Sequence, residues 1–140
     1  MITLLALIGV VLGGCSASGP GSGGSSQSGS SVAAEPTNGD RFPSVTGVKA
    51  IKDDDTWTFD VTMSSPYDSA QRYAAGWRVL GTDGTVYGRM SLGHDHASEQ
   101  PFARTQSRVE IPEDVQTVTV QGHDTDNGYG GKQFTVQLSG

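Results

Sequence analysis

Apolar and polar residues alternate along several short stretches after residue 40. The strictest example is residues 56–63, in which every second side chain is apolar. The apolar positions are Trp57, Phe59, Val61 and Met63. A period of two places these side chains on one face of an extended chain. We therefore predict a β-strand here with one buried face.

Six more strands are expected from the same pattern. They cover residues 45–51, 74–80, 85–91, 105–111, 117–121 and 133–138. Asp83-Gly84 lies between two of them and is a strong hairpin-turn signal. No window of eleven residues carries helical periodicity. Seven strands in about 100 residues, separated by turn signals, predict an all-β, seven-stranded antiparallel sandwich of two sheets.

The order and spacing of these strands resemble an immunoglobulin-like or fibronectin type III-like domain. The likeness is clearest where Ile111-Pro112 precedes the strand at 118–122, a glycine-rich loop and the last strand at 134–138. The resemblance implies binding, adhesion or spacing rather than catalysis, and a single cysteine excludes the antibody subtype with its cysteine pair. The expected core residues are Trp57, Phe59, Val61, Trp77, Val79, Val118, Val120, Phe134, Val136 and Leu138.

A twelve-residue apolar run, Met1–Leu12, opens the chain. A helix needs roughly 20 residues to cross a bilayer, so this run fits the apolar region of a signal peptide better than a membrane span. It lacks the Lys or Arg with which signal peptides usually open, which leaves the translation start undecided.

The residues Leu12-Gly13-Gly14-Cys15 resemble the lipobox of bacterial lipoproteins. The resemblance implies that the Cys15 thiol receives a diacylglyceryl group, that the chain is cut before Cys15, and that the new N-terminus is acylated, for example with palmitate. The resemblance also implies that the protein has a membrane as its partner and a location in the cell envelope. The protein is expected to be anchored by lipid in the cell membrane or outer membrane, facing the extracytoplasmic space.

A Ser/Gly-rich stretch separates this leader from the strands. Thirteen of the sixteen residues at 16–31 are Ser or Gly, so too little apolar surface is available to offset the cost of ordering the chain. We predict a disordered tether whose 24 residues, 16–39, reach about 25–30 Å. The predicted organisation is a signal peptide at 1–14, the lipidated cysteine and linker at 15–39, and the sandwich domain at 40–140.

Composition narrows the classes of function. A net charge of −6 and a pI near 4.8 argue against a nucleic-acid partner, which would require a basic face. The single cysteine excludes an intrachain disulfide framework and any CxxC metal or redox motif.

Histidines and carboxylates gather in two predicted loops. His94 and His96 lie two positions apart in the segment 92–104, and His123 opens the segment 123–132. The candidate ligands of a shared metal ion are His94, His96, His123, Asp95, Glu99 and Asp124. Imidazole and carboxylate suit Zn(II) or Cu(II). The spacing is unspecific, however, and the alternative is that these groups hydrogen-bond backbone atoms and hold the loops. We therefore expect no cofactor, with zinc or copper as the exception if the metal interpretation holds.

Part of the chain is also similar to small secreted bacterial proteins of no assigned role. The likeness covers Trp77 to Leu138 and includes His94-Asp95-His96 and Gly128-Tyr129-Gly130-Gly131-Lys132. It implies that the histidine loop and the glycine-rich turn form one structural unit. We expect Arg104 to pair with Glu99 or Asp95 and Pro101-Phe102 to anchor the loop. The tyrosines Tyr67, Tyr73, Tyr87 and Tyr129 are candidates for partner contact.

Catalytic patterns are poorly represented. The sequence has no Gly-x-Ser-x-Gly elbow and no histidine in a recognisable triad context. The leading hypothesis is a lipid-anchored envelope protein that is not an enzyme, whose sandwich loops bind a protein or ligand partner. The alternative is an extracytoplasmic copper- or zinc-binding protein.

Overall fold

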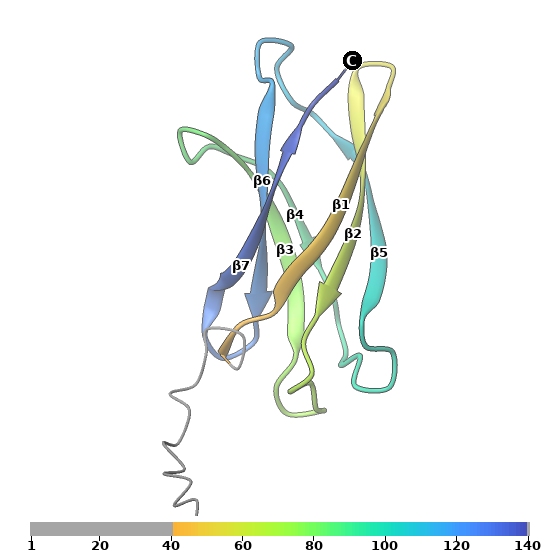
Figure 1. Ribbon diagram of the computed structural model, residues 1–140, viewed down its shortest axis with the longest axis vertical. Helices are drawn as coiled ribbons and strands as arrows, with labels where there is room; N and C mark the ends of the chain where they lie inside the picture. The colour runs from red at the N-terminus through yellow and green to blue at the C-terminus, as the bar shows by residue number, and fades with distance from the viewer. Residues whose placement is uncertain (1–40, 140) are drawn as a thin grey trace, which may run out of the picture. The chain divides into compact units, whose positions relative to one another are not determined.

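The computed structural model describes residues 41–139 (Figure 1). The predicted signal peptide, the lipidation site Cys15 and the predicted linker lie outside the described residues. The seven strands are β1 Ser44–Asp53, β2 Thr56–Ser64, β3 Ala74–Gly81, β4 Val86–Ser91, β5 Phe102–Val109, β6 Thr117–Asp124 and β7 Gly128–Gln137.

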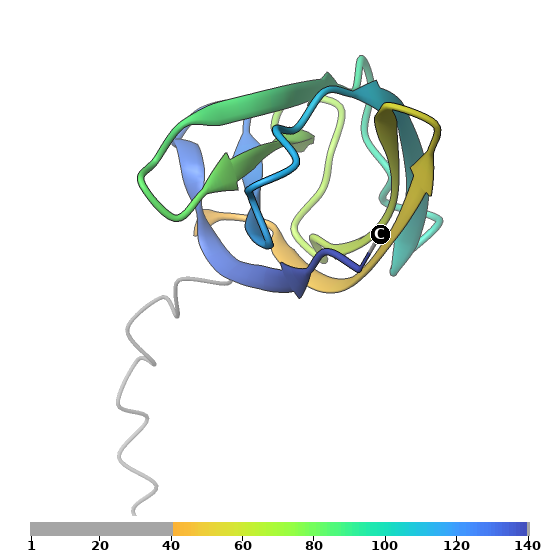
Figure 2. The same cartoon turned by 90° about the horizontal axis from the view of Figure 1, so that it is seen from above.

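The strands form two antiparallel sheets. One has the order β1-β2-β5 and the other β4-β3-β6-β7. Viewed along the strands, the two sheets enclose a common interior (Figure 2). The predicted fold class, an all-β sandwich of seven antiparallel strands, is confirmed.

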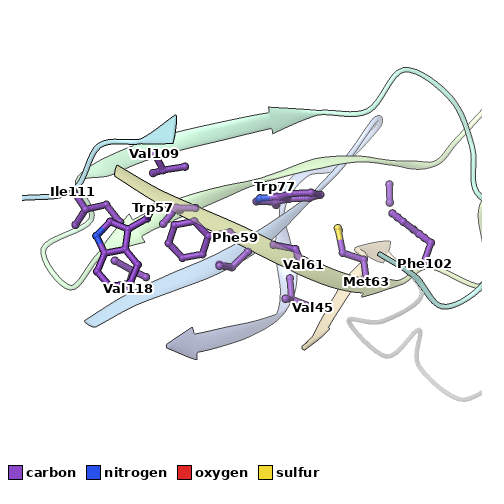
Figure 3. Close-up of a cluster of buried hydrophobic side chains, with 13 residues drawn as sticks. Val45, Trp57, Phe59, Val61, Met63, Trp77, Phe102, Val109, Ile111 and Val118 are labelled. Carbon is purple, nitrogen blue, oxygen red and sulfur yellow. The ribbon is translucent and has the colours of Figure 1, made fainter. Parts of the chain in front are cut away.

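The core follows the period of two. In β2 and β6 every second residue is buried, because alternate side chains point between the sheets. The buried apolar side chains are Val45, Trp57, Phe59, Val61, Met63, Ala74, Trp77, Val79, Phe102, Val109, Ile111, Val118 and Val120 (Figure 3). Three expected core residues are only partly buried: Phe134 and Val136 of β7, and Leu138 directly after it. The reason is that β7 is the edge strand of its sheet.

Two predicted boundaries were wrong. The strand expected at 105–111 runs from Phe102 to Val109. The segment 123–132, expected to be a loop, is mostly strand, because β6 continues to Asp124 and β7 begins at Gly128. A bulge makes this possible. The pairing of β6 with β7 shifts between Val120 and Gly122, and Gly131 adopts a φ of +80°.

The connections gather at the two ends of the sandwich. We call one the loop end: it carries the β2–β3, β4–β5 and β6–β7 connections and the start of the described chain at Arg41 (Figure 1). The opposite end carries the other three connections. The structure places both histidine-bearing segments at the loop end. No helix within residues 41–139 is long and apolar enough to cross a membrane.

Candidate functional site

Asp124 is the centre of a buried polar network at the loop end. It is the last inward-facing residue of β6 and its side chain is fully buried. Its carboxylate accepts hydrogen bonds from the backbone N–H of Asp126 (3.0 Å) and Asn127 (2.9 Å) and from Asn127 Nδ2 (2.7 Å). Arg72 Nε, from the β2–β3 connection, donates to it at 3.2 Å. One carboxylate therefore joins two loops that are far apart in the sequence.

The surroundings of Asp124 favour its ionised form. Burial alone would raise its pKa, but the hydrogen bonds from Asn127 and other donors outweigh burial and hold the pKa below its usual range. The Tyr67 hydroxyl is buried beside this carboxylate without a well-aligned hydrogen bond. Burial first, and the Asp124 carboxylate second, raise the Tyr67 pKa. The guanidinium carbon of Arg72 lies 4.2 Å from the centroid of the Tyr67 ring. Tyr67 is therefore part of the network and not a residue that is left to contact a partner.

Asp68 makes a second link between loops. It is 7% exposed, and its two oxygens accept hydrogen bonds from the backbone N–H of Ala74 and of His96, each at 2.9 Å. Gln100 adds a parallel link: its Oε1 accepts from Ser65 N at 2.7 Å and its Nε2 donates to the His96 carbonyl at 3.1 Å. The β2–β3 and β4–β5 connections are thus held to each other by buried polar side chains.

Sequence reasoning missed Asp68, Arg72 and Gln100. Asp68 and His96 are 28 positions apart, and Arg72 and Asp124 are 52 apart. These residues carry no periodic pattern and match no motif. Only the packing of the two sheets brings their loops together.

His96 is buried as an aromatic ring rather than exposed as a ligand. It is 2% exposed and stacks on the core residue Phe102, with the ring centroids 4.0 Å apart. The His94 ring lies 4.8 Å away, and His96 Nδ1 is 3.9 Å from Asp68 Oδ2. Neither ring nitrogen has a hydrogen-bond partner. Burial, followed by the charges of Arg104 and His94, lowers the pKa of His96, so the ring is neutral at pH 7.

The expected metal ligands do not form one group. Consecutive strand residues point to opposite faces, so Asp124 faces the interior whereas His123 faces outward beside Tyr129, with ring centroids 4.5 Å apart. Within residues 41–139, no three His, Cys, Asp or Glu side chains are placed to hold a metal ion. The shared site expected from His94, His96, His123, Asp95, Glu99 and Asp124 is therefore not formed in this structure.

The alternative interpretation accounts for the three carboxylates. Asp124 binds the β6–β7 turn as described, Asp95 accepts from the backbone N–H of Ala97 at 3.3 Å, and Glu99 pairs with Arg104 at 2.7 Å. The hydrogen bond from Arg104 is the main cause that lowers the Glu99 pKa. Of the two partners predicted for Arg104, the structure selects Glu99. Of the pair predicted to anchor the loop, Phe102 is buried against His96, whereas Pro101 is exposed.

Hollows of the surface are found at the opposite end. Three of them, with volumes of about 290, 480 and 490 Å³, all have Pro112 in their walls. Tyr87 lines two of these hollows, and the predicted histidine loop lines none of the three. All four tyrosines expected at the surface are half-buried.

The buried imidazole should make folding pH-dependent. Because the pKa of His96 is lower in the folded chain than in the unfolded one, its stabilising contribution is complete above about pH 6.5 and is lost as the pH falls below that value. Between pH 6.5 and 5.5, protonation of one such group lowers the free energy of unfolding by at most about 1.4 kcal/mol. Chemical unfolding at pH 7.5 and 5.5 measures this loss.

The matched variants are His96→Leu and His123→Ala. His96→Leu should flatten the pH dependence, since the buried titrating group is gone; His123→Ala, which removes a partly exposed imidazole, is the comparison variant. An equal pH dependence in the wild type and in His96→Leu would contradict this assignment.

The fold and the site together define a seven-stranded β-sandwich domain whose loops are tied by a buried polar network. No family model and no solved structure matches the chain. Over 78 residues the chain is 40% identical to a protein of Halomicrobium mukohataei named "Putative lipoprotein". The matched segment is 56% of this chain and 38% of that relative, so the chain spans well under half of the relative's length.

Proposed function

We propose that this protein is a lipoprotein of the cell envelope, held to a membrane by acylation of Cys15, whose β-sandwich is a non-enzymatic interaction module. The observation that carries the proposal is the solitary cysteine that follows small residues at the end of a twelve-residue apolar run. The name of the Halomicrobium relative supports the same class.

The loop end supports a role in binding rather than catalysis. Asp68 and Asp124 use their oxygens to accept hydrogen bonds from backbone groups, from Arg72 and from Asn127, so these carboxylates hold loops in place. A surface whose loops are already ordered loses little conformational entropy when a partner binds. The network therefore favours a rigid recognition domain.

Surfaces away from the loop end are also open to partners. The described chain begins at Arg41, whose carbonyl accepts a hydrogen bond from Asn127 Nδ2 at 3.1 Å. An anchor on Cys15 would reach the domain from this end. The outward faces of the sheets and the opposite end, with its hollows around Pro112, would remain available to partners.

Replacing the cysteine tests the anchor. In cells that process lipoproteins, the wild-type protein should incorporate labelled palmitate, enter the detergent phase of a phase-partition experiment, and show the mass of an acylated N-terminal cysteine. Cys15→Ser should abolish all three properties, because the sulfur atom of Cys15 is the atom that receives the diacylglyceryl group.

A relocated cysteine is the matched control. The double variant Cys15→Ser, Ser18→Cys retains one thiol, but this thiol no longer follows the Leu-Gly-Gly sequence, so it should remain unmodified. The proposal fails if the wild-type thiol is free, or if Cys15→Ser still partitions into detergent.

A further inference from the structure

The four-stranded sheet has a charge opposite to that of the whole chain. The formal net charge of the protein is −6. Strands β3, β4, β6 and β7 nevertheless contain Arg78, Arg89 and Lys132 and only one acidic residue, Asp124. Asp124 faces the interior and is fully buried. The outward face of this sheet therefore presents cations and no carboxylate.

Arg78 is held in a fixed position on this face. Its Nε and Nη2 both donate to Gln121 Oε1, at 2.8 and 2.6 Å. Its guanidinium carbon lies 4.2 Å from the centroid of the Tyr129 ring. The centroid of the His123 ring lies 4.5 Å from that of Tyr129. A guanidinium carries five N–H donors, and Gln121 engages two of them. The remaining donors are available to a ligand at little entropic cost.

Arg89 lies directly across from Arg78. The two residues are paired in the register of β3 and β4, and like charges at directly opposite positions destabilise a sheet. Within residues 41–139 the ion pairs of arginine are Arg72 with Asp124 and Arg104 with Glu99. Neither Arg78 nor Arg89 pairs with a carboxylate of the described domain. An anionic segment would therefore pair with these two arginines without displacing a carboxylate of the described domain.

We propose that this face binds an acidic segment of a partner protein, whose carboxylates pair with Arg78 and Arg89. Gln121, Tyr129 and His123 keep Arg78 in place and border the contact. A carboxylate matches the planar fork of a guanidinium in a bidentate pair. The inference rests on the proposed role as an interaction module but requires no acylation of Cys15.

Charge favours a peptide over a lipid surface. A membrane of anionic lipids meets the field of the whole domain, whose acidic excess opposes contact. A short acidic segment interacts mainly with charges that lie within one Debye length of it, which is about 8 Å at physiological salt. The charged residues that the strands of this sheet expose are cations, Arg78 and Arg89 among them.

Fluorescence anisotropy with a defined peptide tests the proposal. The probe is a fluorescein-labelled eight-residue peptide in which four Asp alternate with Gly, and the matched probe carries Asn in place of Asp. Full-length protein in a non-ionic detergent should bind the Asp probe and not the Asn probe. Arg78→Gln, Arg89→Gln should weaken binding at least tenfold.

The control variant has the same change in charge on the other sheet. Lys49→Gln, Lys52→Gln alters two cations of β1 and should weaken binding less than twofold. Equal weakening in both double variants would show general electrostatic attraction and overturn the proposal. A cooperative unfolding transition verifies that the arginine variants remain folded. Removal of the like-charge pair raises the unfolding midpoint, and loss of the Arg78–Gln121 hydrogen bonds lowers it.

Two further measurements separate this inference from the lipoprotein proposal. Cys15→Ser protein should bind the Asp probe as tightly as the wild type, so loss of acylation and loss of binding are distinguishable. The same Cys15→Ser protein, with vesicles containing 30% phosphatidylglycerol, should not co-sediment. Arginine-dependent binding to these vesicles without binding to the Asp probe would overturn the proposal in favour of a lipid surface.

Discussion

Asp124→Ala is expected to lower the free energy of unfolding by about 3 kcal/mol. The substitution removes the acceptor of four donors: two backbone N–H groups of the β6–β7 turn, Asn127 Nδ2 and Arg72 Nε. Breaking a buried ion pair from one side typically costs about 3–5 kcal/mol. The lower figure applies because the Arg72 side chain is 29% exposed and regains water when its partner is lost. The midpoint of urea unfolding at constant slope measures the change.

Two substitutions bracket this result. Asp126→Ala removes an exposed carboxylate two positions further along and should change stability by less than about 0.5 kcal/mol. Asp124→Asn preserves the shape of the side chain but removes its charge. The loss of stability in this variant should lie between the losses in Asp124→Ala and Asp126→Ala. If Asp124→Ala proves no more costly than Asp126→Ala, the network does not hold the loop end as described.

Gly76→Ala is expected to lower the free energy of unfolding by about 4 kcal/mol or more. It is the most destabilising one-methyl substitution that the structure suggests. Gly76 has a φ of +136°, and an added Cβ would lie 1.9 Å from the carbonyl oxygen of Met90 on β4. That backbone region is essentially closed to residues with a side chain. The alanine variant must therefore separate β3 from β4 or change the backbone next to the bulge at Ala74/Gly76.

Gly93→Ala is the matched control. Gly93 has no neighbour within 4 Å of an added Cβ, so the same change of one methyl group should alter stability by less than about 0.5 kcal/mol. The measurement is the unfolding midpoint together with the yield of folded protein. A Gly76→Ala variant as stable as Gly93→Ala would contradict the close approach of β3 and β4.

Most of the fold was predictable because the alternation of apolar and polar residues that marks a strand can be seen in the sequence of that strand alone. A period of two is enforced by burial of one face, so it is visible at 56–63 without any knowledge of the partner strands. The glycine-rich start of β7 was not predictable in this way. Glycines carry no side-chain pattern, and the bulge at Gly131 exists only because β6 pairs with this stretch from Gly122 onward.

The site was predictable only in part. The pairing of Arg104 with Glu99 spans five positions and was expected. The roles of His96 and His123 were not, because a sequence shows their spacing but not whether a loop folds its imidazole inward. His96 stacks on Phe102 in the interior, and His123 stands on the outward face beside Tyr129.

Local chemistry in the sequence was sufficient for the strand pattern, the all-β class and the acidic charge, because each depends on neighbouring residues or on sums over the chain. Tertiary structure alone decided that Asp68 and Asp124 tie three loops together. These contacts join residues separated by 28 and 52 positions. Such distances are closed only when two sheets pack, because burial of their apolar faces selects one register among many.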